Sequence, residues 1–111
     1  MSEAKLKQII DEVCEMYRRQ YQNRIIHIFM YGSYARGDNT DGSDIDMVAI
    51  VDGERLELQD KLKNIWSEAA TLGYENDVII SPMVIPQQEF EDYKDVLPYY
   101  RNIAREGVHV G

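Results

Sequence analysis

Cysteine, basic residues and long apolar stretches are all scarce in this sequence. The 111 residues include one cysteine, Cys14, so no internal disulfide can form, and its place among the apolar positions of a predicted helix indicates a small core residue. We therefore expect a reducing, cytoplasmic setting. No apolar run approaches the length of a membrane span, and the first residues contain no apolar signal core, so we expect neither export nor membrane insertion.

Positive charge is also scarce. Twelve Lys and Arg stand against twenty Asp and Glu, the formal net charge is −8, and the largest basic cluster is Arg18-Arg19 with Arg24 nearby. This balance argues against direct binding of nucleic acid and suits a basic protein partner. The two histidines and one cysteine are dispersed along the chain, so they cannot form a zinc cluster or a Cys-His hydrolase site.

The spacing of apolar residues changes several times along the chain, which is typical of a mixed α/β fold, and the length indicates one domain, residues 1–111. Tyr17 and Trp66 have apolar neighbours at helical spacing, so both are expected to pack in the core. Gly73 is expected to end the second helix, and Asp77 to start the third strand. Helices are expected over 3–22, from the turn 52–54 to Gly73, and over 86–106 with a break at Pro98; strands are expected over 25–31, 44–51 and 76–81, with an extension at 84–85 beyond Pro82.

Two carboxylates stand at the start of the second predicted strand. Asp44 and Asp46 are separated by one residue and lead into the apolar run 47–51. Because side chains alternate along a strand, both carboxylates point to the same face and can bind the same metal ions. The apolar run holds the pair on a regular element, whereas residues 38–42 are interpreted as an ordinary turn.

A Gly-Ser turn lies just upstream of the carboxylates. Gly32 and Ser33 directly follow the first predicted strand, where bare backbone amides and a hydroxyl can approach phosphate oxygens. Phosphate and a divalent metal can therefore meet in one small site. That combination is the chemistry of nucleotidyl transfer.

Two other motifs that bind metal or phosphate fail in the same stretch. An EF-hand loop would place Gly37 and Val48 where carboxylates are needed. A Walker A loop would place Asp38 and Asn39 where Lys and Ser or Thr are required. A calcium-binding EF-hand and a P-loop nucleoside triphosphatase are thus both excluded.

The combination of Gly32-Ser33, Arg36-Gly37, a five-residue spacer and Ser43-Asp44-Ile45-Asp46 resembles the signature of the DNA polymerase β-like nucleotidyltransferase superfamily. The chain is most similar to the minimal members, which include the MntA-type antitoxins of HEPN/MNT toxin–antitoxin pairs. The resemblance covers nearly the whole chain. It implies an α/β (α+β) fold in which a small mixed β-sheet is flanked by helices.

The resemblance also implies how the acidic residues act. Asp44 and Asp46 would coordinate two Mg²⁺ ions that bridge the triphosphate of ATP and the attacking nucleophile. The superfamily has a third carboxylate on a neighbouring strand, which binds metal and helps to deprotonate the acceptor hydroxyl. Asp77 is the candidate for this catalytic and metal-binding role, and Glu75 is its competitor.

Four further residues are expected to contact or support the nucleotide. Gly32 and Ser33 would hold the β- and γ-phosphates, the glycine by close backbone approach and the serine through its hydroxyl. Arg36 either pairs with triphosphate oxygens or braces the acidic loop, and the sequence leaves both readings open. Ser43 is expected to order the loop by hydrogen bonding, since no base is placed to activate it.

The function implied by the resemblance is the transfer of AMP from Mg·ATP to a protein hydroxyl, with a tyrosine of a HEPN ribonuclease toxin as the favoured acceptor. Two alternatives stay open. The chain could act as a binding antitoxin that masks the toxin by contact. It could also be a small-molecule nucleotidyltransferase that lacks the usual extra helical domain and completes its acceptor pocket by dimerisation, as a homo- or hetero-oligomer.

Overall fold

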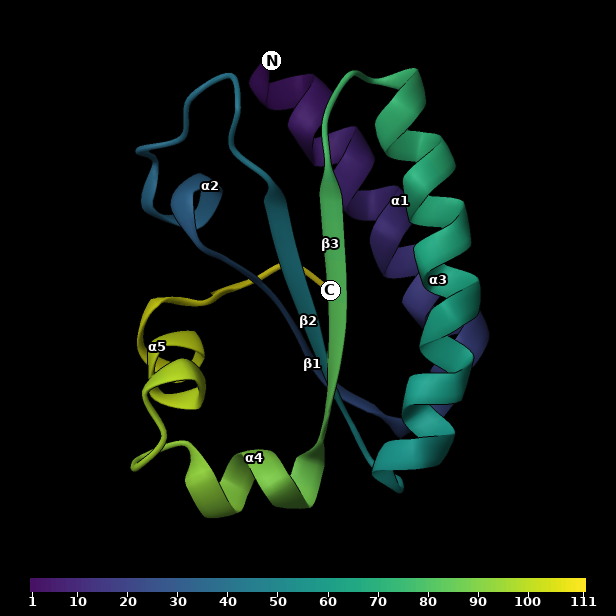
Figure 1. Ribbon diagram of the computed structural model, residues 1–111, viewed down its shortest axis with the longest axis vertical. Coiled ribbons are helices and arrows are strands. Elements are labelled where there is room, and N and C mark those ends of the chain that lie inside the picture. The colour runs from purple at the N-terminus through teal and green to yellow at the C-terminus, as the bar shows by residue number, and fades with distance from the viewer.

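The computed structural model describes all 111 residues, and four strands form its sheet. The apolar helix faces and strand runs of the sequence become the elements shown in Figure 1. In chain order they are α1 (Glu3–Tyr21), η1 (Gln22–Arg24), β1 (Ile25–Tyr31), α2 (Ser33–Arg36), β2 (Ile45–Val51), α3 (Arg55–Glu75), β3 (Ile80–Pro86), α4 (Gln87–Tyr93), α5 (Pro98–Glu106) and β4 (Val108–His109).

The sheet is mixed, with the strand order β3-β2-β1-β4. The central strand β2 runs antiparallel to β1 and parallel to β3, and β4 adds a short antiparallel edge to β1. Helices α1 and α3 cover one face, α4 and α5 lie on the other, and the short α2 lies between the end of β1 and the start of β2, with Tyr34 and Ala35 packed against the main core (Figure 1). The expected small mixed sheet flanked by helices is therefore confirmed.

The main core lies between the sheet and the helices α1 and α3. Tyr17 is fully buried there, and its hydroxyl donates to the Met83 carbonyl at 2.8 Å and accepts from the Met83 N–H at 3.1 Å. Burial raises the pKa of Tyr17 well above its usual value. The expectation that Tyr17 packs in the core is confirmed.

Trp66 corrects a prediction, because its side chain is 46% exposed and does not enter the core. The buried stripe of α3 runs through Leu58, Leu62, Ile65 and Ala69. Trp66 follows Ile65 directly and is therefore rotated by about 100° from that stripe. Helical spacing identified the buried face correctly but overestimated its width.

The α3–β3 connection also differs from the prediction. α3 continues to Glu75, and Gly73 lies inside its last turn, where an added Cβ would clash with the Val78 carbonyl oxygen. Asp77 has a φ of 54°, a left-handed conformation that turns the chain, so β3 starts at Ile80 and not at Asp77. Gly73 permits a close approach of the chain instead of ending the helix.

β3 forms an open edge of the sheet and contains two prolines. The Ile45 N–H donates to the Ile79 carbonyl at 2.9 Å, so the odd-numbered residues of β3 direct their backbone groups toward β2. Pro82 and Pro86 consequently face the open edge, where the missing N–H costs no ladder hydrogen bond. This explains why Pro82 lies within a strand that the sequence suggested would be interrupted there.

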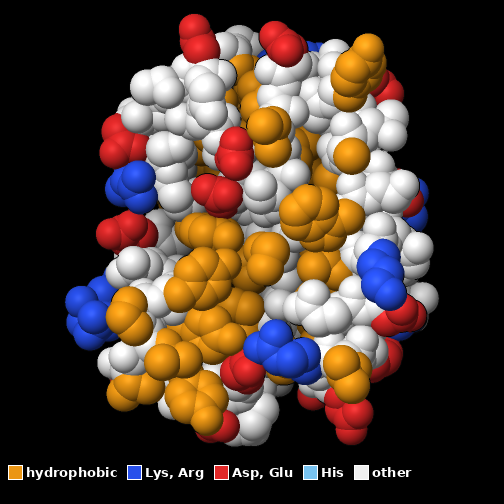
Figure 2. Space-filling model, in the orientation of Figure 1, with side chains coloured by type: hydrophobic (Ala, Val, Ile, Leu, Met, Phe, Trp, Pro, Cys, Tyr) orange, Lys and Arg blue, Asp and Glu red, His pale blue; other side chains and the backbone are white.

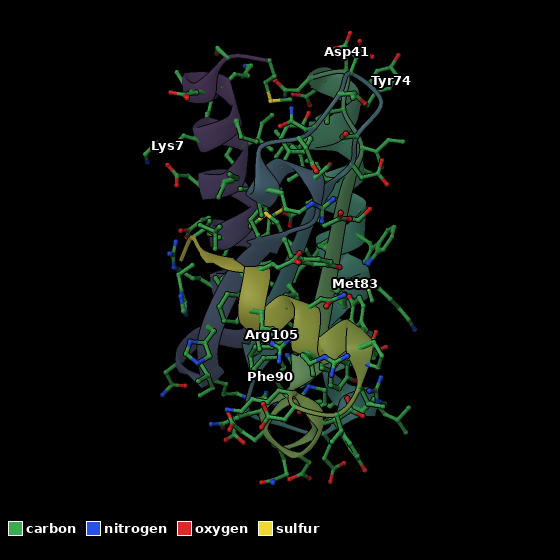
Figure 3. The ribbon with its side chains drawn as sticks, turned by 90° about the vertical axis from the view of Figure 1, so that its left-hand side faces the viewer. Lys7, Asp41, Tyr74, Met83, Phe90 and Arg105 are labelled. Atoms are coloured by element: carbon green, nitrogen blue, oxygen red, sulfur yellow. The ribbon has the colours of Figure 1, made fainter.

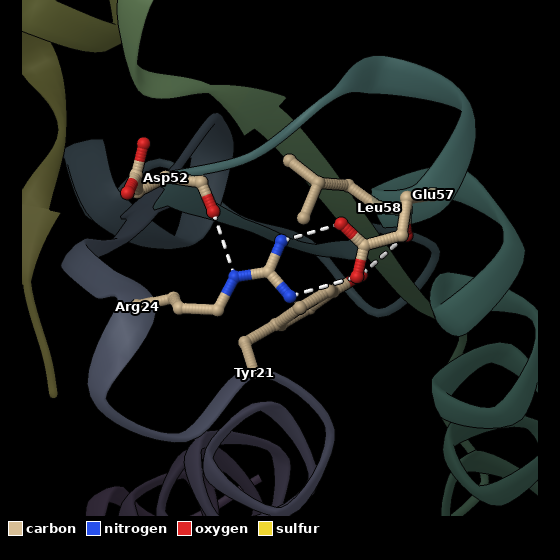
Figure 4. A network of polar contacts seen from close by, with 5 residues as sticks. All are labelled: Tyr21, Arg24, Asp52, Glu57 and Leu58. Atoms are coloured by element: carbon tan, nitrogen blue, oxygen red, sulfur yellow. Dashed lines mark hydrogen bonds and ion pairs between the residues drawn. The ribbon is translucent and has the colours of Figure 1, made fainter.

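A polar network fixes the end of β2 that lies farthest from Asp46 (Figure 4). The Arg24 Nε donates to the Asp52 carbonyl at 2.9 Å, and its two terminal nitrogens pair with the Glu57 carboxylate at 2.7 and 2.6 Å. The Tyr21 hydroxyl donates to the Leu58 carbonyl at 2.7 Å. This network ties η1 to the β2–α3 turn and so holds β2 at the end opposite its acidic start.

Among all the helices, none combines the length and the apolar character needed to cross a membrane.

Candidate active site

Asp46 is the centre of a row of polar side chains across three strands. Its strand partners in register are Tyr31 on β1 and Ser81 on β3. Residues directly opposite one another share a face of the sheet, so all three side chains rise toward the side that carries α4 and α5. The adjacent row, formed by Phe29, Val48 and Met83, is apolar.

The two predicted metal-binding carboxylates lie near one another at the start of β2. Burial raises the pKa of Asp46, the nearby charge of Asp44 raises it further, and Arg36 opposes both effects. Two neighbouring carboxylates also attract a divalent cation, and oxygen ligands of this kind suit Mg²⁺. Figure 2, in the orientation of Figure 1, shows acidic side chains beside a continuous apolar area.

The Gly32 turn packs directly against Asp46. Gly32 has φ 76° and ψ −156°, a conformation that is essentially restricted to glycine, and a Cβ added there would lie 2.5 Å from the Asp46 Oδ2. Ser33 starts the short helix α2, whose first N–H groups have no acceptor within the helix. The predicted phosphate-binding turn and the predicted metal ligand are therefore in contact.

Arg36 braces the acidic loop in the structure. Its Nε lies 3.2 Å from the Asp38 carboxylate, and a terminal nitrogen lies 3.7 Å from the carboxylate of Glu106 on α5. Exposed pairs of this kind contribute about 1 kcal/mol or less, so an arriving triphosphate can compete for the guanidinium. The Asp38 pair was one of the two readings of the sequence, whereas the Glu106 contact had no sequence signal.

Ser43 closes the turn before β2. Its hydroxyl accepts from the Thr40 N–H at 2.8 Å, and its own N–H donates to the Thr40 carbonyl at 3.0 Å. This pair of bonds orders the chain directly before Asp44, as expected for a loop-ordering serine. A contact between Ser43 and a nucleotide stays a prediction.

Asp77 lies near Asp44 but apart from Asp46. Asp44 and Asp77 line one cleft of about 340 Å³ between the 41–44 loop and the α3–β3 connection, and Asp46 is not part of its lining. Asp41 and Tyr74, which border the same cleft, appear together at the top of Figure 3. No three acidic, histidine or cysteine side chains are grouped closely enough to hold a metal ion.

Ser81 is the β3 residue that pairs with Asp46, and its side chain carries a hydroxyl and not a carboxylate. Glu75, the competitor of Asp77, lines a separate groove between α1 and α3. Sequence reasoning missed Tyr31 and Ser81 because their positions beside Asp46 depend on strand register. The one local signal was that Tyr31 directly precedes the Gly-Ser turn.

Comparisons with known proteins identify the family and the fold of this chain. Residues 6–108 match the family described as nucleotidyltransferase domain. Two proteins of Methanocaldococcus jannaschii, both provisionally named protein adenylyltransferases, are 27% and 29% identical over 80% and 88% of this chain. The chain spans 60% of the length of the first of these relatives and 90% of the second.

Solved structures share the fold. A toxin–antitoxin structure with AMP-PNP has a TM-score of 0.57 at 14% identity, covering 92% of this chain and 72% of that one. A mutant of the toxin–antitoxin MntA-HpeT has a TM-score of 0.54 at 11% identity, with the same coverage. Together with the family match, which covers most of the chain, these findings confirm the resemblance read from the signature: the chain belongs to the nucleotidyltransferase domain family.

Proposed function

We propose that this protein transfers AMP from Mg·ATP to a tyrosine hydroxyl of a HEPN-type ribonuclease toxin and so acts as its antitoxin. The observation that carries the proposal is the contact between the glycine-dependent turn at Gly32 and the carboxylate of Asp46, with Asp44 beside it. The names of the two archaeal relatives and the AMP-PNP in the structural neighbour support the choice of AMP and ATP.

The carboxylates of Asp44 and Asp46 would hold two Mg²⁺ ions. Held by these carboxylates, Mg²⁺ would neutralise the triphosphate and would stabilise charge on the attacking and leaving oxygens. The fit rests on the donor set: two carboxylates at the start of β2, of which Asp46 has a pKa raised by burial and by the charge of Asp44. The protein's own task is to fix these oxygens beside the phosphates.

The turn after β1 would position the phosphates. Gly32 lets the backbone approach closely, and the first N–H groups of α2 together with the Ser33 hydroxyl donate toward the β- and γ-phosphates. Arg36 would exchange its contacts with Asp38 and Glu106 for triphosphate oxygens. Ser43 would keep Asp44 in place through its bonds to Thr40.

The acceptor hydroxyl would approach over the row that contains Asp46. On this face the apolar row of Met83 lies next to the polar one, so a partner tyrosine can rest its ring on apolar side chains while its hydroxyl reaches the carboxylates. The net charge of −8 favours a partner with a basic surface.

A labelling assay with the co-purified toxin tests this function. We expect Mg²⁺-dependent transfer of label from α-labelled ATP to a toxin tyrosine, and we expect Asp44→Asn to reduce it to background. Asp41→Asn is the matched control, because Asp41 lines the same cleft but is interpreted as a turn residue. Label that survives Asp44→Asn would contradict the assignment. Toxin that is inhibited without any label would identify a binding antitoxin instead.

Asp77 is proposed as the third carboxylate, on the strength of the cleft that it shares with Asp44. We expect Asp77→Asn to slow transfer about a hundredfold, since a general base typically contributes 10²–10⁴. The loss should shrink as the pH rises and solvent base takes over. Glu75→Gln should leave the rate unchanged, because Glu75 lines another groove. An unchanged rate with Asp77→Asn would remove Asp77 from the catalytic set.

A further inference from the structure

Two tyrosines, Tyr31 and Tyr99, form a pair beside the carboxylates. The proposed transfer of AMP to a partner does not involve either of them. Tyr31 is the β1 partner of Asp46 in register, so the two side chains rise from the same face with Cβ atoms about 5 Å apart. The Tyr31 hydroxyl is hydrogen-bonded to the Tyr99 hydroxyl at 2.8 Å. Helix α5 therefore places a second phenol one hydrogen bond away from the residue that flanks Asp46.

Tyr99 is more accessible than the two tyrosines that surround it. Tyr31 is held on a strand against the apolar cluster of this face, and burial is the main cause of its raised pKa, which disfavours its phenolate. The Tyr100 hydroxyl donates to Glu89 at 2.9 Å, and Glu89 is also paired with Arg55. Tyr99, in the first turn of α5, is 43% exposed.

The contact between Tyr31 and Tyr99 is weak enough to break without disturbing the fold. The rings of Tyr31 and Tyr99 meet edge to face, with centroids 6.0 Å apart and an interplanar angle of 89°. Such a contact contributes about 1 kcal/mol, and the hydroxyl hydrogen bond contributes a similar amount. Tyr99 can therefore leave Tyr31 at low cost and turn its hydroxyl toward a phosphate held at Asp46.

We propose that Tyr99 is itself an acceptor of AMP, modified within the same chain; this proposal rests on the proposed function. The Tyr99 Oη attacks the α-phosphorus of ATP and forms an Oη–P bond. The bond between that phosphorus and the bridging oxygen breaks, pyrophosphate leaves with the electron pair, and the phenolic proton passes to solvent water. The product is an AMP ester on Tyr99, and no oxidant or reductant is consumed.

Self-modification competes with transfer to a partner. Both reactions need a phenol hydroxyl beside the polar row formed by Tyr31, Asp46 and Ser81. A bound partner tyrosine therefore excludes Tyr99 from that position. The AMP ester projects into solvent at an exposed side chain, where it meets no packed core. Added partner is therefore expected to slow the modification of Tyr99.

The test incubates the full chain alone with Mg·ATP and follows its intact mass, with peptide mapping of the product. We expect one AMP per chain on Tyr99, at a rate per chain that does not depend on protein concentration. Tyr99→Phe should reduce self-modification at least tenfold. Tyr93→Phe is the matched control, because Tyr93 is 45% exposed on α4 and makes no hydroxyl contact with Tyr31. A melting curve of each variant verifies its fold.

Several outcomes would overturn the inference. An AMP ester on Tyr31, or a rate that rises in proportion to protein concentration, would contradict modification of Tyr99 within one chain. If the toxin is labelled while the chain never is, Tyr99 is not an acceptor and the proposed function stands. If neither protein is labelled, both proposals fail.

A second measurement needs no turnover. Tetranitromethane nitrates exposed tyrosines, and we expect Mg²⁺ with α,β-methylene-ATP, whose α–β bridge cannot be cleaved, to slow nitration of Tyr99 several-fold while leaving Tyr93 unaffected. Equal nitration of Tyr99 with and without the Mg²⁺-bound analogue would contradict its place beside the nucleotide. Protection without any AMP ester in the Mg²⁺ reaction would also overturn the acceptor role.

Discussion

Replacement of Asp46 by asparagine is expected to lower AMP transfer about a thousandfold. Metal-ion stabilisation of transition-state charge amounts to several kcal/mol, and each 1.36 kcal/mol corresponds to about a factor of ten in rate. An amide keeps the shape of the side chain but removes the charge that attracts Mg²⁺. The measurement is the initial rate of toxin labelling at saturating Mg²⁺, with Asp41→Asn as the control that should retain the rate.

The same substitution should not weaken the fold. The folded-state pKa of Asp46 is raised by burial and by Asp44, so its carboxyl binds a proton more tightly in the folded chain than in the unfolded one. The metal-free protein therefore loses stability as the pH rises from the unfolded pKa, about 3.9, through the folded pKa. In EDTA at neutral pH, Asp46→Asn should melt at or above the wild-type temperature, and the difference should vanish in acid. A clear drop in melting temperature would show that the activity loss reflects misfolding.

Gly32→Ala should disable the site without removing any reactive group. The backbone conformation at Gly32 is essentially restricted to glycine, so alanine costs about 1–3 kcal/mol of stability. Its Cβ would also lie 2.5 Å from the Asp46 Oδ2 and must displace that oxygen or the turn. Since a misplacement of about 1 Å can cost about a hundredfold in rate, we expect at least that loss in the labelling assay.

Gly42→Ala is the matched control for Gly32→Ala. A Cβ at Gly42 meets no atom within 4 Å, and Gly42 is not among the glycines with positive φ. The Gly42→Ala variant should therefore retain both the labelling rate and the melting temperature of the wild-type protein. If Gly32→Ala kept full activity, the turn and the carboxylate would not form one site.

The sequence predicts the positions of site residues where these depend only on neighbouring residues in the chain. Asp44, Asp46 and Gly32 could be placed at strand ends because alternation and turn preferences act within a few residues. The row that joins Asp46 to Tyr31 and Ser81 could not be predicted, since strand register is set by contacts between distant segments.

Two errors had conformational causes. The third strand was placed too early because nothing in the local sequence signals the left-handed backbone at Asp77. The sequence predicts a helix stop at Gly73 because glycine is common at helix ends, whereas in the structure this glycine makes room for the Val78 carbonyl. The contact between Arg36 and Glu106 depends on the docking of α5, which local patterns do not specify.

The prolines of β3 also limit how this protein can associate. An open strand edge normally invites another chain to extend the sheet, in a second copy as readily as in a foreign partner. With Pro82 and Pro86 facing outward, and the Val84 carbonyl between them held by the Gln59 amide at 3.4 Å, this edge offers a poor template. Recognition of a partner along this edge must then depend on side chains, and the chain is protected from polymerising through β3.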